Sequence, residues 1–272
     1  MADLRDWLDL SDRVCVVTGA ASGIGAAVAR ALAQAGARLA LLDRDEGNCQ
    51  RVGEELSLTG SEVIAIGCDT SREDEVAAAA DEVRARLGPC TGLVNNAGML
   101  RSNSLDDISL EEWNAVMAVN LTGYLLCARA FSRDMREQGG GAMVHVASIA
   151  GHFPQTNSGA YSASKAGVRL LSRQMSVEWG PLGIRSNTIC PGMIRTALSA
   201  AFYAQPGIEQ RRSAITASKR IGEPCDIADV ALFLISKRSA YVNGTDILVD
   251  GGMSSMLMDL VPRPGFNDGG PL

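Results

Sequence analysis

The stretch Thr18-Gly19-Ala20-Ala21-Ser22-Gly23-Ile24-Gly25 decides the fold of this chain. It joins an apolar β-branched run, residues 13–18, to an alanine-rich amphipathic run, residues 23–35, which predicts a strand, a turn and a helix. Glycine lets a backbone come close to a pair of phosphates, and a helix N-terminus offers free N–H donors and a positive dipole. The glycine spacing is G-x-x-x-G-x-G rather than G-x-G-x-x-G. We interpret the stretch as a dinucleotide-binding turn.

Short β-branched runs alternate with longer helical runs over the rest of the chain. Beyond the first strand and helix, strands are expected over residues 38–43, 62–68, 93–95, 142–148, 184–189 and 245–250. Helices are expected over residues 46–58, 74–87, 110–138, 158–179 and 226–236, with Ser71 and Asp74 forming a capping box. The alternation predicts an α/β protein, a doubly wound Rossmann fold whose parallel sheet has about seven strands and helices on both faces. One domain is expected over residues 1–255, followed by a Pro/Gly-rich tail over 256–272.

Composition narrows the functional classes. The 272 residues are 46% hydrophobic and 21% charged, which excludes intrinsic disorder as a description of the whole chain. The formal net charge of -6 argues against nucleic acid as a partner. The uncharged run of residues 14–29 is too short to span a bilayer comfortably, so we expect no membrane partner. Seven scattered cysteines without a C-x-x-C pair indicate a reducing compartment, and we expect a cytoplasmic protein without a metal.

An acid at the end of the second strand bears on the choice of dinucleotide. Asp43 follows Gly25 by 18 residues, where a carboxylate accepts hydrogen bonds from the adenosine ribose hydroxyls. A 2′-phosphate there would face this carboxylate, and two unit charges 4 Å apart repel by roughly 4 kcal/mol at an effective dielectric of 20. Ser22 offers no compensating positive charge. The sequence therefore favours NAD over NADP, with Arg44 as the residue that could reach a phosphate instead.

Further motifs follow in a fixed order. Asn95-Asn96-Ala97-Gly98 follows the fourth strand, Asn120 lies in the long helix, and Ser148 ends the fifth strand. Tyr161-Ser162-Ala163-Ser164-Lys165 opens the next helix, and Pro191-Gly192 follows the sixth strand. Together these motifs resemble the short-chain dehydrogenase/reductase family, in its typical subgroup of about 250 residues. The resemblance extends over residues 12–252.

The resemblance implies an oxidoreductase that transfers a hydride between NAD(H) and a secondary alcohol or ketone. Tyr161 would be the catalytic acid/base, Lys165 would lower its pKa and hold the nicotinamide ribose, and Ser148 would orient the substrate oxygen. Asn120 would keep a water chain between Lys165 and solvent. The cofactor would contact Gly19, Ser22, Gly23, Ile24, Gly25, Asp43, Arg44, Asp69, Thr70, Asn96, Ala97, Gly98, Tyr161, Lys165, Pro191, Gly192, Ile194 and Thr196.

Elementary chemistry supports the pairing of Tyr161 with Lys165. Four residues separate them, so they share one face of a helix. A tyrosine pKa of about 10 must fall by about 3 units, roughly 4 kcal/mol, before the phenol can act as a base at neutral pH. A lysine one turn away supplies part of that stabilisation.

Other functions are open on the same residues. In a serine hydrolase Ser148 would be the nucleophile, but its neighbours lack the glycines of a nucleophile elbow, and strand alternation puts His145 on the opposite face. A nucleotide-binding protein without turnover would not need Ser148, Tyr161 and Lys165 together. An NADP-dependent 3-oxoacyl thioester reductase is a third alternative.

The substrate and the assembly are the least determined features. Residues 197–215, with Phe202, Tyr203, Arg211 and Arg212, stand where the family places a segment that covers the substrate, and we expect the two arginines to face solvent. The resemblance implies a homotetramer built on the helices 110–138 and 158–179. Four further residues are candidates to contact the small-molecule substrate: His152, Gln155, Asn157 and Met193.

Overall fold

Seven parallel strands form one sheet in the order β3-β2-β1-β4-β5-β6-β7. The computed structural model describes residues 7–8, 10–11, 13–196, 199–203, 205–261 and 263–265. Strand order reverses between β1 and β4, so the loops after these two strands open a crevice at the carboxyl edge of the sheet. The strands are β1 (Val14–Thr18), β2 (Arg38–Asp43), β3 (Val63–Gly67), β4 (Cys90–Asn95), β5 (Gly141–Val146), β6 (Ile184–Pro191) and β7 (Asp246–Val249).

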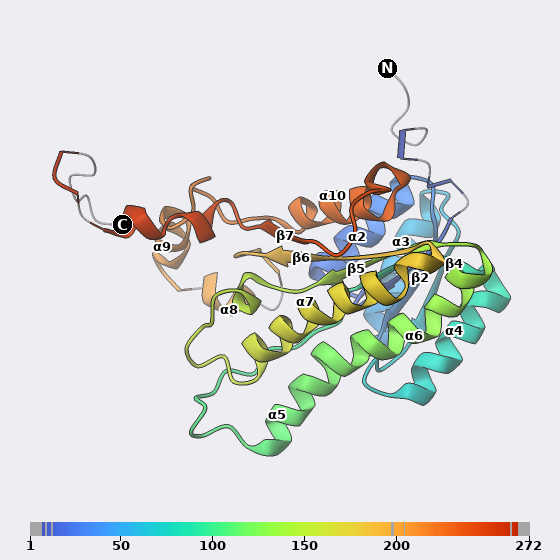
Figure 1. Cartoon of the computed structure of the whole chain (residues 1–272), viewed down its shortest axis with the longest axis horizontal. Coiled ribbons are helices and arrows are strands. Elements are labelled where there is room, and N and C mark those ends of the chain that lie inside the picture. The colour runs from blue at the N-terminus through green and yellow to red at the C-terminus, as the bar shows by residue number, and fades with distance from the viewer. Residues whose placement is uncertain are drawn as a thin grey trace.

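Helices cover both faces of the sheet (Figure 1). One apolar core joins the sheet to α2 (Gly23–Gln34), α3 (Glu46–Leu58) and α10 (Pro224–Ile235). The other joins it to α4 (Glu73–Leu87), α6 (Gly123–Glu137) and α7 (Tyr161–Glu178). Helix α5 (Leu110–Met117) precedes α6, and two short helices, α8 (Ala200–Tyr203) and α9 (Ile208–Ala214), follow β6. The predicted doubly wound fold is confirmed.

Several predicted boundaries were wrong, among them the end of β6, at Pro191 rather than 189, and the start of α10, at Pro224 rather than 226. Strand β4 begins at Cys90 rather than at residue 93. Strand β5 ends at Val146, so Ser148 lies beyond the strand, where its hydroxyl accepts a hydrogen bond from the Ala150 N–H (3.1 Å). Helix α7 begins at Tyr161 rather than at 158, because Asn157 and Gly159 both have a φ of 54° and cannot continue a right-handed helix.

The capping box expected at Ser71 and Asp74 is absent. Arg72 is the N-cap of α4 and makes no capping hydrogen bond with its side chain. The Ser71 hydroxyl instead donates to Asp69 Oδ1 (2.7 Å), two residues earlier in the connection between β3 and α4. The three acids that open α4, Glu73, Asp74 and Glu75, still face the positive end of its dipole.

The long helix predicted over 110–138 is interrupted. Residues Ala118–Thr122 form one π turn between α5 and α6, in which the Gly123 N–H donates to the Ala118 carbonyl five residues back. Asn120 lies in this turn and is fully buried. The stretch Leu110–Glu137 is long and apolar enough to cross a membrane, with a mean hydropathy of 1.3 over its most apolar window. That window is 44% buried against the protein, as in a core helix of a globular fold, so it is weak evidence for a membrane span.

The described end of the chain carries short turns. Met253–Ser255 and Leu257–Leu260 form 3₁₀ turns, which the Pro/Gly content of the tail did not predict. The division into a domain over 1–255 and a tail over 256–272 stays a prediction.

Candidate active site

A cavity of about 1300 Å³ opens at the carboxyl edge of the sheet, beside β1, β4, β5 and β6. Its size exceeds the usual range for a drug-sized ligand, roughly 300–1,000 Å³, and suits a dinucleotide together with a small substrate. Every residue predicted to contact cofactor or substrate, or to be catalytic, lines this cavity except Gly25, Asn120 and His152.

The glycine loop and the segment after β4 lock together at the floor of the cavity. The Thr18 hydroxyl accepts the N–H groups of Asn96 (3.0 Å) and Ala97 (3.1 Å), and the Asn96 amide donates to the carbonyls of Thr18 (3.1 Å) and Gly19 (3.0 Å). Gly19 has a φ of 65°, and a Cβ on it would lie 2.8 Å from Ala97 Cα. A Cβ on Gly25 would lie 2.0 Å from the Gly19 carbonyl. Gly25 therefore packs against the inner side of the glycine loop, which explains why it does not line the cavity.

Asp43 is held in place by the backbone on either side of it. Its Oδ2 accepts the Ala21 N–H (2.9 Å) and its Oδ1 accepts the Asp45 N–H (3.0 Å), which fixes the carboxylate at the wall of the cavity. Arg44 is exposed beside it and lines the same wall. Asp69 lines the same cavity two residues after Gly67, the partner of Asp43 in the sheet, and the hydrogen bond from the Ser71 side chain lowers its pKa. The open wall formed by the glycine turn, the free N-terminus of α2 and this carboxylate fits the adenosine diphosphate part of a dinucleotide.

Ser148 and Tyr161 meet on the other side of the cavity. Ser148 comes from the turn after β5, and Tyr161 is the first residue of α7. The Ser148 hydroxyl donates a hydrogen bond to the phenol of Tyr161, which lowers its pKa, although burial is the larger effect and raises it. A positive charge nearby is therefore needed to make Tyr161 a base at neutral pH.

Lys165 supplies a cation one turn along α7. It is 3% exposed, and burial lowers its pKa to about 7. Its Nζ lies 5.9 Å from the centroid of the Tyr161 ring. Lys165 and Tyr161 line the same cavity, as the i, i+4 spacing predicts.

Asn120 lies behind the cavity wall and is hydrogen-bonded to it. Its Oδ1 accepts the Met99 N–H (2.8 Å), while its Nδ2 donates to the Met99 carbonyl (2.9 Å) and to Ser164 Oγ (3.2 Å). The side chain thus links the segment after Gly98 to helix α7. Both Asn120 Oδ1 and Lys165 Nζ lie near Gly98. Its expected role in a water chain stays a prediction.

The two histidines lie away from the reacting groups. His145 is 1% exposed and contacts Asn95 Nδ2 (3.1 Å) and Ser186 Oγ (3.1 Å). Burial lowers its pKa to about 3, so it is a neutral structural residue, as predicted. The prediction that His152 contacts substrate is not supported, because its Nε2 points to Asp246 (4.0 Å) and the residue does not line the cavity. Asp246 also forms ion pairs with Arg169 (2.9 Å) and Arg173 (2.5 Å), outside the cavity.

The sequence missed several residues of the cavity wall. Met99, Leu100 and Ser102 follow the Asn-Ala-Gly motif and carry no pattern of their own.

Tyr203 and Arg212 line the cavity, with the Arg212 guanidinium 5.2 Å from the Tyr203 ring centroid, whereas Arg211 is exposed. The expectation that both arginines face solvent was therefore wrong for Arg212. The side chain of Phe202 lies outside the described residues.

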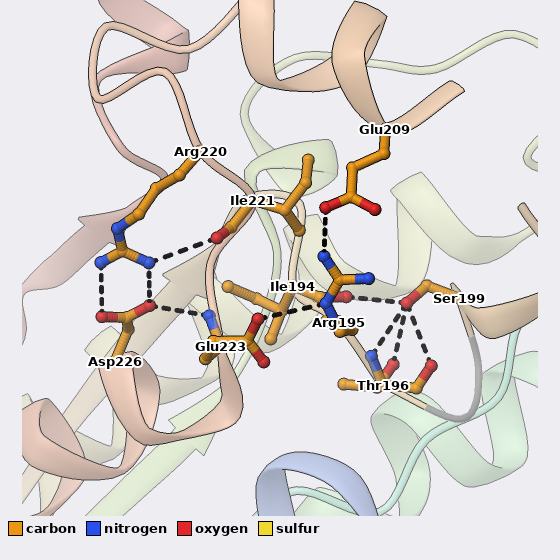
Figure 2. Close-up of polar contacts among 9 residues, drawn as sticks. All are labelled: Ile194, Arg195, Thr196, Ser199, Glu209, Arg220, Ile221, Glu223 and Asp226. Carbon is orange, nitrogen blue, oxygen red and sulfur yellow. Dashed lines mark hydrogen bonds and ion pairs between the residues drawn. The ribbon is translucent and has the colours of Figure 1, made fainter. Parts of the chain in front are cut away.

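The segment that follows β6 is held by ion pairs between Arg195 and two glutamates. Figure 2 shows Arg195 reaching from the end of β6 to Glu209 of α9 (2.6 Å) and to Glu223 before α10 (3.1 Å). The Ser199 hydroxyl donates to the Ile194 carbonyl (2.8 Å) and accepts the Thr196 N–H (3.0 Å). These contacts place Ile194 and Thr196 at the cavity wall, where both were predicted.

Comparison with known proteins decides the family. The family model described as Enoyl-(Acyl carrier protein) reductase matches residues 19–254. The chain belongs to the short-chain dehydrogenase/reductase family. A D-threitol dehydrogenase from Mycolicibacterium smegmatis is 38% identical to this member over 89% of the chain and 93% of the relative.

Solved structures agree with this assignment. The fold matches a 7α-hydroxysteroid dehydrogenase complexed with NADH and 7-oxo glycochenodeoxycholic acid, with a TM-score of 0.88 and 32% identity, covering 93% of this chain and 98% of the other. It also matches a gluconate 5-dehydrogenase from Burkholderia cenocepacia in complex with NADP and tartrate, with a TM-score of 0.87 and 32% identity, covering 93% and 99%. The two solved structures hold different nicotinamide cofactors, NADH in the first and NADP in the second.

Proposed function

We propose that this short-chain dehydrogenase/reductase transfers a hydride between NAD(H) and a secondary alcohol or ketone, with Tyr161 as acid/base. The observation that carries the proposal is the hydrogen bond between Ser148 and Tyr161 in the same cavity as the glycine turn and Lys165. The nicotinamide, when bound, accepts or gives the hydride at C4. The protein's own residues supply position and proton transfer.

Each of these residues has a distinct task. In oxidation, Tyr161 as phenolate takes the proton of the substrate hydroxyl, and in reduction it returns that proton to the carbonyl oxygen. Ser148 donates a hydrogen bond to the same oxygen. Lys165 as ammonium favours the phenolate of Tyr161 through its charge. Gln155, Asn157 and Met193 line the cavity beside these groups and would contact the rest of the substrate.

A panel assay tests the reaction class. Purified protein is mixed with NAD or NADP and a panel of polyols, cyclic alcohols, hydroxysteroids and 3-hydroxyacyl thioesters, and absorbance at 340 nm is followed. Reduction of NAD by a secondary alcohol is the expected result. Ester hydrolysis without cofactor would contradict the proposal in favour of a hydrolase. Tight NADH binding with no turnover on any alcohol or ketone would favour a nucleotide-binding role.

The preference for NAD is tested at Asp43. The variant Asp43→Ser removes the carboxylate that faces the ribose while keeping a small polar side chain. The ratio of kcat/KM for NADP to that for NAD is expected to rise at least about tenfold, because roughly 4 kcal/mol of repulsion at 4 Å is partly relieved. Steady-state kinetics with both cofactors measures it. The matched control Arg44→Ala should lower the same ratio, and a wild-type enzyme that already prefers NADP would contradict the proposal.

Assembly into a homotetramer is proposed on the exposed apolar faces of the long helices. Leu170 and Val177 lie two turns apart on α7 and are 68% and 76% exposed, and Leu110 at the start of α5 is 72% exposed. Burying such side chains in an interface is favourable, whereas a charge there opposes association.

The variant Leu170→Glu tests this assembly. Light scattering is expected to give four chain masses for the wild type and a smaller species for the variant. The control Leu58→Glu changes a leucine that is even more exposed (90%), on α3 at the opposite face of the sheet, and should leave the mass unchanged. A wild-type monomer would contradict the proposal.

A further inference from the structure

A buried tyrosine outside the recognised motifs contacts the catalytic-site lysine. Tyr124 lies on α6, one turn after Asn120, and is 1% exposed. Lys165 Nζ donates to Tyr124 Oη (3.1 Å) and to the Val146 carbonyl (2.8 Å). Tyr124 Oη in turn donates to the same carbonyl (2.9 Å), so the ammonium, the phenol and the carbonyl form a closed triangle.

The triangle determines which way the ammonium points. An ammonium has three N–H donors, and the triangle takes two of them on the side of the protein core. The third remains for the cavity, which Lys165 lines, and Gly98 lies on that side, where a Cβ would be in ordinary van der Waals contact with Nζ (3.5 Å). The phenol oxygen thus sets the direction of the donor that reaches the cofactor and substrate space.

Tyr124 is itself held rigidly and stays neutral. Its ring stacks on that of His145, with centroids 6.0 Å apart, and its carbonyl accepts the Asn95 amide (3.0 Å). Burial raises the pKa of the Tyr124 phenol well above its usual value, so its oxygen keeps both its proton and its free lone pairs. The phenol is therefore a fixed acceptor for Lys165 throughout the working pH range.

We propose that Tyr124 is a positioning residue that holds the Lys165 ammonium protonated and aimed into the cavity. The inference rests on the proposed role of Lys165 toward Tyr161. Around Nζ, the titratable groups are Tyr124 on α6, Tyr161 on α7, Cys190 on β6 and the neutral His145 on β5. Because the ammonium has no carboxylate partner among these groups, the neutral acceptors supply its stabilisation.

The variant Tyr124→Phe removes the acceptor and keeps the ring. The chain has three lysines, at positions 165, 219 and 237, so lysine labelled with ¹³C at Cε gives three signals, and the one lost in Lys165→Met belongs to Lys165. The pKa of Lys165 read from this signal is expected to fall by about one pH unit in Tyr124→Phe, because a charged donor loses a hydrogen bond. An unchanged titration of Lys165 would overturn the inference.

The pH profile of activity gives a second readout. Less ammonium at a given pH means a higher pKa for Tyr161, so the acid limb of kcat/KM for alcohol oxidation should move to higher pH in Tyr124→Phe. The control Ser132→Ala lies on the same helix, is 1% exposed, and removes a hydroxyl that donates to the Arg129 carbonyl (3.0 Å). Ser132→Ala should change neither the pKa of Lys165 nor the pH of the acid limb of kcat/KM. A loss of kcat in Tyr124→Phe at every pH without a shift would mean a merely structural role and overturn the inference.

Two further outcomes keep the test decisive. If Tyr124→Phe does not fold, the exchange of the ammonium protons with water is measured in the wild type, where those of Lys165 should exchange far more slowly than those of Lys219. Equal exchange would overturn the inference. If Tyr161→Phe is inactive while Lys165 titrates alike with and without the Tyr124 hydroxyl, this inference fails and the proposed function stands. Full activity of Tyr161→Phe would overturn the proposed function instead.

Discussion

Replacing Tyr161 by phenylalanine is expected to reduce kcat/KM about 10²–10⁴-fold, the usual contribution of a positioned acid/base. The phenol is the group that Ser148 contacts beside Lys165, and phenylalanine keeps the ring while removing the proton carrier. NADH binding should persist, because the glycine turn and Asp43 lie on the other side of the cavity. Steady-state assays at 340 nm and fluorescence titration with NADH measure the two effects.

Ser162→Ala is the matched control for this loss. Ser162 follows Tyr161 on α7 but does not itself line the cavity, and its hydroxyl contacts that of Ser158 (2.9 Å) and accepts the Gln155 N–H (3.4 Å). The variant should keep most of the activity. A Tyr161→Phe enzyme that retained more than about a tenth of the wild-type rate would exclude the acid/base role, since that role costs at least about 10²-fold.

Adding one methyl group at Gly25 is expected to abolish tight cofactor binding. The Cβ of Gly25→Ala would lie 2.0 Å from the Gly19 carbonyl and 2.6 Å from Asn96 Nδ2, so the glycine loop must shift away from the phosphate position. Overpacking of this kind costs about 1–3 kcal/mol of stability. A similar loss in binding would weaken NADH affinity roughly tenfold to a hundredfold, at 1.4 kcal/mol for each factor of ten.

Gly47→Ala is the control that isolates the steric effect. Gly47 lies in the first turn of α3, and a Cβ on it meets nothing within 4 Å. Alanine there should leave NADH binding unchanged and stabilise the fold by about 0.4–1 kcal/mol, because the unfolded chain loses freedom. Thermal melting and NADH titration of both variants give the comparison. Wild-type affinity in Gly25→Ala would contradict the role assigned to the turn.

Local patterns predicted most of the fold and many of the residues that line the cavity. Strand β2 and helix α3 were predicted to the residue, because a short apolar run and a longer amphipathic run carry their pattern in the sequence itself. Gly19, Gly23 and Asp43 were placed beside the cavity for a related reason, since their positions depend on the shape of a turn and on the end of a strand. A residue whose role follows from its neighbours along the chain is readable before the structure is known.

Features that depend on distant contacts were not predicted. His152 turns toward Asp246, which is 94 positions further along the chain, and nothing near residue 152 indicates this. The contact between Tyr124 and Lys165 likewise joins residues 41 positions apart. The wall residues Met99, Leu100 and Ser102 carry no motif, so only the folded loop shows that they face the cavity.

The π turn at Ala118–Thr122 has a consequence for evolution and engineering. The turn holds one residue more than an α-helix needs, and each residue advances a helix by about 100°. Deleting a single residue there would make the helix more regular and would rotate α6 against α5, carrying Tyr124 away from the lysine. The same rotation would turn the apolar face of α6, with Cys127, Phe131 and Met135, out of the core, so selection for stability and selection for turnover would both oppose such a deletion. Libraries of stabilised variants of this enzyme should therefore keep residues 118–122 fixed in length.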